Sequence, residues 1–110
     1  MIVITAPATA QAFRAIGDGV APCGAWTYVR QSGNDALADG YRQWVVGLLS
    51  GVGAVEVGKY NPLQGVDAQV VWSWTDRYCL ANPSKLLTDA AVAFAEAHPN
   101  RDRRELRTSA

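Results

Sequence analysis

At 110 residues the chain is long enough for one hydrophobic core and too short for two. Hydrophobic residues make up 49% of it and charged residues 18%, a composition that excludes a disordered protein. Ten basic residues balance ten acidic ones, so the chain lacks the general positive charge that binds nucleic acids or anionic membranes. We expect one globular domain without nucleic acid as a partner.

The first twelve residues have the features of the end of a signal peptide. Residues 1–4 are apolar, and both Ala8-x-Ala10 and Ala10-x-Ala12 have the small-residue spacing that signal peptidase accepts. We expect residues 1–12 to be a signal-peptide remnant, cut after Ala12, from a chain whose natural start lies further upstream or whose first residues were removed. An Ala-rich leader of a cytosolic protein is the alternative, because the apolar stretch is shorter than the roughly seven residues of a working signal.

Cys23 and Cys79 are the two cysteines of the chain. Their even number predicts a disulfide between them and export to an oxidising compartment, for which we choose the periplasm. In the chain-entropy model, a cross-link over a loop of this length stabilises a fold by about 4 kcal/mol. Two buried free thiols are the alternative.

Hydrophobic residues recur with the helical period nearly throughout, which predicts an all-α domain over residues 13–98. A first helix is expected over about 22–31, ending at Ser32-Gly33-Asn34. A second is expected over about 39–57, with Asp39 as its N-cap. Its apolar face consists of residues at steps of mostly three and four, namely Tyr41, Trp44, Val45, Leu48, Leu49, Val52 and Val55.

Three glycines interrupt this second helix: Gly47, Gly51 and Gly53. Each costs up to about 1 kcal/mol relative to alanine in a helix interior. We therefore expect a neighbouring helix or a Trp ring to approach the backbone closely at these positions.

Residues 58–65 are typical of a loop, and a third helix is expected from Val66 or Asp67 to Leu80. Its apolar side carries Val70, Val71, Trp74 and Tyr78. Asn82-Pro83 predicts the start of a fourth helix, because Asn caps free amides and Pro is tolerated at the first helical position. Its apolar face consists of Leu86, Leu87, Ala90, Ala91, Phe94 and Ala95.

The fourth helix is expected to stop at His98-Pro99, and residues 99–110 to form a flexible charged tail. The Cys23–Cys79 disulfide would join the start of the first helix to the end of the third. The predicted fold is therefore a small four-helix bundle of the orthogonal type, closed by one disulfide.

No motif in the sequence fits catalysis. Ser50 stands in a G-x-x-S-G string within a helical pattern, whereas a nucleophile elbow needs a strand-to-helix turn. His98, the single histidine, lies at a helix end, where we interpret it as a surface residue. A zinc site is not expected either, because zinc usually has four clustered ligands and the Cys and His residues here are scattered. Asp76, beside Arg77, is interpreted as a helix-surface charge. We predict a non-enzymatic protein without cofactor or metal.

Two aromatic residues are candidate partner contacts. Trp72 and Trp74 point about 200 degrees apart on a helix, so they cannot both enter one core. Trp72, on the face of Cys79, either packs over the disulfide or anchors a protein partner or a second copy of the chain. Tyr60, on the loop, is the other candidate.

Three groups of residues form a recognisable pattern: a cysteine leading a Trp-containing helix, a W-V-x-G-x-L-S-G helix and a W-x-D-x-Y-C-x-x-N-P segment. The pattern resembles the small periplasmic proteins grouped around the HdeA/HdeB acid-stress chaperones and the Tai-like immunity proteins of type VI secretion. The likeness covers roughly residues 23–98. The residues that carry it are Cys23 and Trp26; Trp44, Val45, Gly47, Leu49, Ser50 and Gly51; and Trp74, Asp76, Tyr78, Cys79, Asn82 and Pro83.

The resemblance implies an exported helical protein that acts by binding a protein partner or client. In a stress-protective chaperone, protonation of the carboxylates near pH 4 would make the chain strongly positive and loosen the bundle. The alternative is an immunity protein, in which Trp72 or Tyr60 blocks a secreted toxin enzyme. Stable membrane insertion is not expected, because no stretch approaches the roughly 18 apolar residues that a spanning helix needs.

Overall fold

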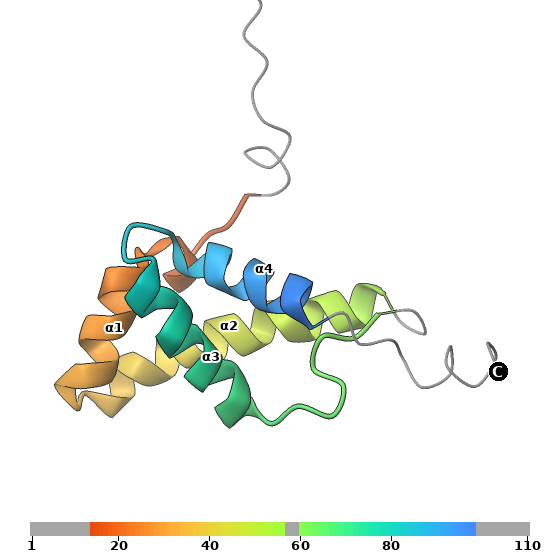
Figure 1. The fold of residues 1–110 in the computed structure, drawn as a ribbon, viewed down its shortest axis with the longest axis horizontal. Helices are drawn as coiled ribbons and strands as arrows, with labels where there is room; N and C mark the ends of the chain where they lie inside the picture. The colour runs from red at the N-terminus through yellow and green to blue at the C-terminus, as the bar shows by residue number, and fades with distance from the viewer. Residues whose placement is uncertain (1–13, 57–59, 99–110) are drawn as a thin grey trace, which may run out of the picture.

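The computed structural model describes residues 14–56 and 60–98, and within these ranges the chain is helical without a β-strand. A short 3-10 helix precedes four α-helices (Figure 1), in the order η2 (Asp18–Val20), α1 (Cys23–Ser32), α2 (Asp35–Val55), α3 (Ala68–Ala81) and α4 (Leu87–Ala97). The prediction of an all-α four-helix bundle with one disulfide is confirmed. The expected leader, residues 1–12, and the expected tail, residues 99–110, lie outside the described residues.

A very short turn joins α1 to α2. Gly33 ends α1 in the left-handed conformation, with φ of 79°, which favours glycine because it has no Cβ. The Asn34 side chain then accepts a hydrogen bond from the backbone N–H of Leu37 at 3.1 Å and caps α2. The predicted end of the first helix is confirmed, but Asp39 is not the N-cap of the second. The helix begins one turn earlier because Asn34 supplies the cap.

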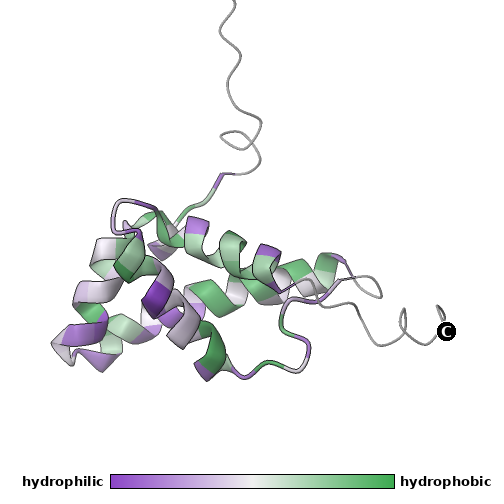
Figure 2. Ribbon diagram, in the orientation of Figure 1, coloured by the Kyte–Doolittle hydropathy of each residue, from purple (hydrophilic) through white to green (hydrophobic). Residues whose placement is uncertain are grey.

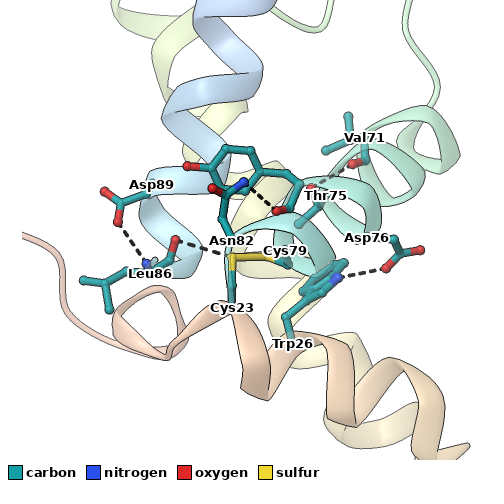
Figure 3. Close-up of a disulfide and its surroundings, with 10 residues drawn as sticks. Cys23, Trp26, Val71, Thr75, Asp76, Cys79, Asn82, Leu86 and Asp89 are labelled. Atoms are coloured by element: carbon teal, nitrogen blue, oxygen red, sulfur yellow. Dashed lines mark hydrogen bonds between the residues drawn. A yellow bond between two sulfur atoms is a disulfide. The ribbon is translucent and has the colours of Figure 1, made fainter. Parts of the chain in front are cut away.

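The Cys23–Cys79 disulfide joins the start of α1 to the end of α3, as predicted, and both cysteines are fully buried (Figure 3). The segment after α3 lies against the same place through three backbone hydrogen bonds: Cys23 N–H to Lys85 O at 2.6 Å, Gly24 N–H to Pro83 O at 3.0 Å and Leu87 N–H to Ala21 O at 2.8 Å. We call the disulfide and these three bonds the clasp. It holds the start of α1, the end of α3 and the start of α4 together.

The predicted start of the fourth helix, at Asn82-Pro83, is wrong. Asn82 is instead the C-cap of α3, and its side-chain amide donates to the carbonyl oxygen of Tyr78 at 2.9 Å. The fourth helix begins only at Leu87. The Asp89 carboxylate accepts a hydrogen bond at 2.9 Å from the backbone N–H of Leu86, the residue before the helix. The clasp explains the difference, because the intervening segment points its carbonyl groups at α1 and so cannot be helical at the same time.

One face of each α-helix contributes to the core. Fully buried side chains come from all four: Trp26, Leu49, Val71 and Phe94. Most residues of the predicted apolar faces are buried or half-buried. The prediction is wrong for three that are exposed, Val55, Val70 and Leu86. The helical period shows which side of a helix is apolar. It does not show how much of that side the other elements of the fold cover.

The close approach of a Trp ring to a glycine occurs in η2 rather than in α2. Gly19 is buried, and a Cβ atom there would overlap the ring of Trp44. The indole Nε1–H of Trp44 also donates to the carbonyl oxygen of Ile16 at 3.2 Å. The N-terminal segment, rather than another α-helix, therefore covers this part of α2.

Asp76 is not a simple surface charge, because it connects α1 to α3. Its carboxylate accepts a hydrogen bond from Trp26 Nε1 at 2.8 Å, shown in Figure 3, and two from the Arg30 guanidinium at 2.9 Å each. The hydrogen bond to Asp76 raises the pKa of Arg30, while burial acts in the opposite direction. Trp26 is fully buried, so Asp76 satisfies a polar atom that water does not reach.

Replacing Asp76 by alanine should lower the free energy of unfolding by about 2 kcal/mol, because the buried Trp26 donor loses its acceptor and Arg30 its ionic partner. Asp39→Ala is the matched control. Asp39 forms a longer, exposed ion pair with Arg42 at 3.6 Å, so its loss should change the value by less than about 0.5 kcal/mol. Urea unfolding measures both, and equal effects of the two substitutions would contradict the role given to Asp76.

Candidate functional site

An apolar groove lies between the C-terminal halves of α2 and α4, away from the clasp. We call it the α2–α4 groove. It has a volume of about 290 Å³ and is lined by Leu48, Leu49, Val52, Tyr60, Ala91, Val92, Ala95 and Glu96. Figure 2 shows hydrophobic colours over most of these two helix halves. Apart from the Tyr60 ring and the Glu96 carboxylate, the lining side chains are aliphatic.

A second, more open hollow adjoins the groove on the surface of α2. It is lined by Gly47, Leu48, Gly51, Val52, Val55 and Glu56. Leu48 and Val52 belong to both hollows and form the ridge between them. Val55 is 83% exposed, so this side of α2 presents apolar surface to solvent.

The glycines of α2 do not have the neighbours that the sequence predicted. Among the described residues, nothing would lie within 4 Å of a Cβ atom added at Gly47 or Gly51, so no described helix or Trp ring approaches there. At Gly53 the neighbour is the side chain of Asn61, whose Oδ1 would lie 3.0 Å from the added Cβ. Gly47 and Gly51 therefore leave the backbone of α2 open to whatever lies against the second hollow.

Tyr60 lies at the groove rather than protruding from the loop. It is half-buried, and its hydroxyl donates to the carbonyl oxygen of Ala95 on α4. Burial raises the pKa of Tyr60, and the negative charge of Glu96 raises it further. The loop before α3 is thus attached to the C-terminal end of α4. The predicted partner contact at Tyr60 stays a prediction.

Trp72, the other predicted contact, is half-buried and packs against the core. The Arg42 guanidinium lies over its indole ring, with 5.2 Å between Cζ and the ring centroid. Arg42 belongs to the N-terminal half of α2, whereas Tyr60 lies at the C-terminal half. The structure therefore does not bring the two predicted contacts into one site, and a partner contact at Trp72 also stays a prediction.

A polar cleft of about 340 Å³ lies elsewhere, lined by Thr27, Arg30, Gln31, Asp76 and Leu80. Its two charged groups are paired with each other, at 2.9 Å. Because Arg30 and Asp76 already neutralise one another, the cleft presents no free charge to a ligand. The α2–α4 groove is the stronger candidate site.

Three further features of the described residues bear on a metal site, a free histidine and a membrane span. No three His, Cys, Asp or Glu side chains described lie close enough to hold a metal ion. His98 is not a free surface histidine, since its ring stacks on Phe94 with 4.0 Å between centroids and its Nδ1 lies 2.8 Å from the Phe94 carbonyl oxygen. No described helix is long and apolar enough to cross a membrane.

The lining of the groove suits apolar side chains. It offers aliphatic surface, one tyrosine and one carboxylate. Sequence reasoning missed this site, because it assigned Leu48, Val52 and Val55 to the core. The available signal was the spacing of Gly47 and Gly51, which we interpreted as a packing contact within the chain. Comparisons with protein-family models, with curated proteins and with solved structures gave no match.

Alanine at Gly47 or Gly51 should raise the free energy of unfolding by up to about 1 kcal/mol each, because helix propensity improves and no described residue obstructs the new Cβ. Gly53→Ala is the matched control in the same helix. There the gain is offset or reversed by the contact with Asn61. Urea unfolding of the three variants is the measurement, and destabilisation by Gly47→Ala or Gly51→Ala would show that these positions are covered.

The raised pKa values of Tyr60 and Tyr78, both caused mainly by burial, predict a loss of stability in alkali. The folded chain holds these protons more tightly than the unfolded chain, whose tyrosines ionise near pH 10. The contribution of these two tyrosines to the free energy of unfolding is therefore fully present below about pH 10. It falls as the pH rises through their folded-state pKa values.

Tyr60→Phe should make the fall between about pH 9 and about pH 11.5 smaller. The same substitution at Tyr28, whose side chain is 73% exposed, should leave the fall unchanged. The free energy of unfolding in urea at several pH values tests this prediction. An undiminished alkaline fall in Tyr60→Phe would contradict it.

Proposed function

We propose that this protein is an exported, non-enzymatic, chaperone-like binding protein that holds an apolar segment of another polypeptide in the α2–α4 groove. The observation that carries the proposal is an apolar groove that is open while the bundle is folded and its disulfide is formed. No described element covers this surface, which therefore offers a site for unfolded or partly folded clients, because these expose apolar side chains.

The expected strength of binding favours transient contact with clients. Each apolar side chain fully buried contributes about 1.5–3 kcal/mol, and the groove has room for only a few. Association costs at least about 4 kcal/mol in lost freedom, so the net affinity should be modest. A protein that blocks an enzyme needs a larger and tighter interface, of the kind that protease inhibitors form.

One feature supports an oxidising compartment such as the periplasm. The buried disulfide is of the kind that such compartments preserve. The immunity alternative receives less support, because Tyr60 is attached to α4 and Trp72 lies under Arg42, so neither protrudes as a plug for a cleft.

The proposal is tested by suppression of aggregation of two clients, one that unfolds on mild heating at about pH 7 and one that unfolds in acid at about pH 3. Val52→Glu places a charge in the groove and should weaken suppression at neutral pH by about tenfold or more. Val70→Glu is the control, since Val70 is exposed on α3 away from the groove.

Suppression at neutral pH that is lost in Val52→Glu and retained in Val70→Glu supports the groove as the binding site. Suppression only in acid, equal in all three proteins, would show that an opened chain is the active form and that the groove is not the site. No suppression at either pH would overturn the chaperone-like function.

A further inference from the structure

The C-termini of α2 and α4, the two helices that form the groove, lie at the same end of the groove (Figure 1). Figure 1 shows α2 and α4 running side by side in the same general direction, with their C-terminal ends together. Neither helix has a basic residue in its last turn. A helix C-terminus carries a partial negative charge equivalent to about half an electron, so the two ends add.

Two carboxylates lie at this same end. Glu56 is the C-cap of α2 and lines the second hollow, and Glu96 is in the last turn of α4 and lines the groove. Among the described residues that line the two hollows, these two are the charged ones. Glu96 lines the same groove as Tyr60, whose pKa is raised by burial and by the negative charge of Glu96. The end of the groove formed by the C-termini of α2 and α4 therefore attracts a cation.

The shape of the surface favours a helix as occupant. The ridge of Leu48 and Val52 has a hollow on each side, which fits side chains at positions i and i+3 or i+4 of a helix. The open backbone at Gly47 and Gly51 permits close approach of another helix backbone. The described chain has no strand whose edge could pair with an extended peptide.

A second copy of α2 fits this surface less well than a different partner does. Arg42 is the basic residue of α2, and it is already engaged over Trp72 and beside Asp39. A second α2 would therefore bring apolar surface without an available cation for Glu56 and Glu96.

We propose that the segment bound in the groove is an amphipathic helix whose apolar face is flanked by Lys or Arg, with the basic residue placed against Glu56 and Glu96. This inference rests on the proposed function and specifies the chemistry of the partner. Apolar side chains fill the two hollows, the partner backbone passes over Gly47 and Gly51, and the cation lies at the two helix C-termini.

The test uses two synthetic helical peptides of about 18 residues, or five turns, with the same Leu and Ala face. One has Lys at both ends and the other has Glu at both ends. Calorimetry with the full chain at about 20 mM and about 500 mM salt should show the Lys peptide binding at least about tenfold more tightly at low salt, with most of the difference lost at high salt.

Charge-neutral variants identify the carboxylates responsible. In the Glu56→Gln, Glu96→Gln double variant the preference should fall to about twofold or less, whereas Asp39→Asn, an exposed carboxylate elsewhere on α2, should retain it. Gly51→Leu fills the second hollow and should weaken both peptides equally. A Lys peptide with a central proline, which breaks the helix, should bind at least about tenfold more weakly.

The outcomes separate this inference from the function on which it rests. Equal binding of the two peptides, or a preference that survives in the double variant, would overturn the basic partner while leaving an apolar binding groove. Undiminished binding of the proline peptide would overturn the helical occupant. Failure of both peptides to bind would overturn the inference and count against the groove itself.

Discussion

The Cys23–Cys79 disulfide fixes the start of α1 against the end of α3. It joins residues 56 positions apart and lies with no solvent exposure at the place where α1 begins and α3 ends. In the chain-entropy model such a cross-link contributes about 4 kcal/mol, a large share of the roughly 5–15 kcal/mol by which domains are stable. A chain with a core this small can then leave some apolar surface uncovered and still fold.

The clasp also divides the bundle into two ends with different properties. At one end, the disulfide and the backbone hydrogen bonds of the segment before α4 hold three helix ends together. At the other end, α2 and α4 contact through aliphatic side chains, and the loop before α3 adds the hydrogen bond from Tyr60. The groove lies at this second end, where binding a partner does not require the clasp to open.

The helical period and the cysteine count were sufficient to predict the helices and the disulfide, because both depend on local spacing and on pairing of two residues. Helix starts were less predictable. Asn34 and Asp39 are both good caps for the second helix, and Asn34 is the one that caps α2. Asn82 is also a good N-cap, but the segment after it is bonded to the start of α1, so the next helix begins only at Leu87. The sequence also contained the apolar residues of the groove, but periodicity could not show that none of the described elements covers Gly47, Gly51 and Val55.

The most direct test of this account is hydrogen exchange of the backbone amides in the oxidised chain and in the Cys23→Ala, Cys79→Ala variant. In the oxidised chain the amides of Cys23, Gly24 and Leu87 should exchange only through global unfolding, and those of the last turns of α2 should exchange faster by local opening. In the variant the clasp amides should lose most of their protection. Clasp amides that exchange as fast as the end of α2 in the oxidised chain, or that stay protected without the disulfide, would contradict the central place given to the clasp.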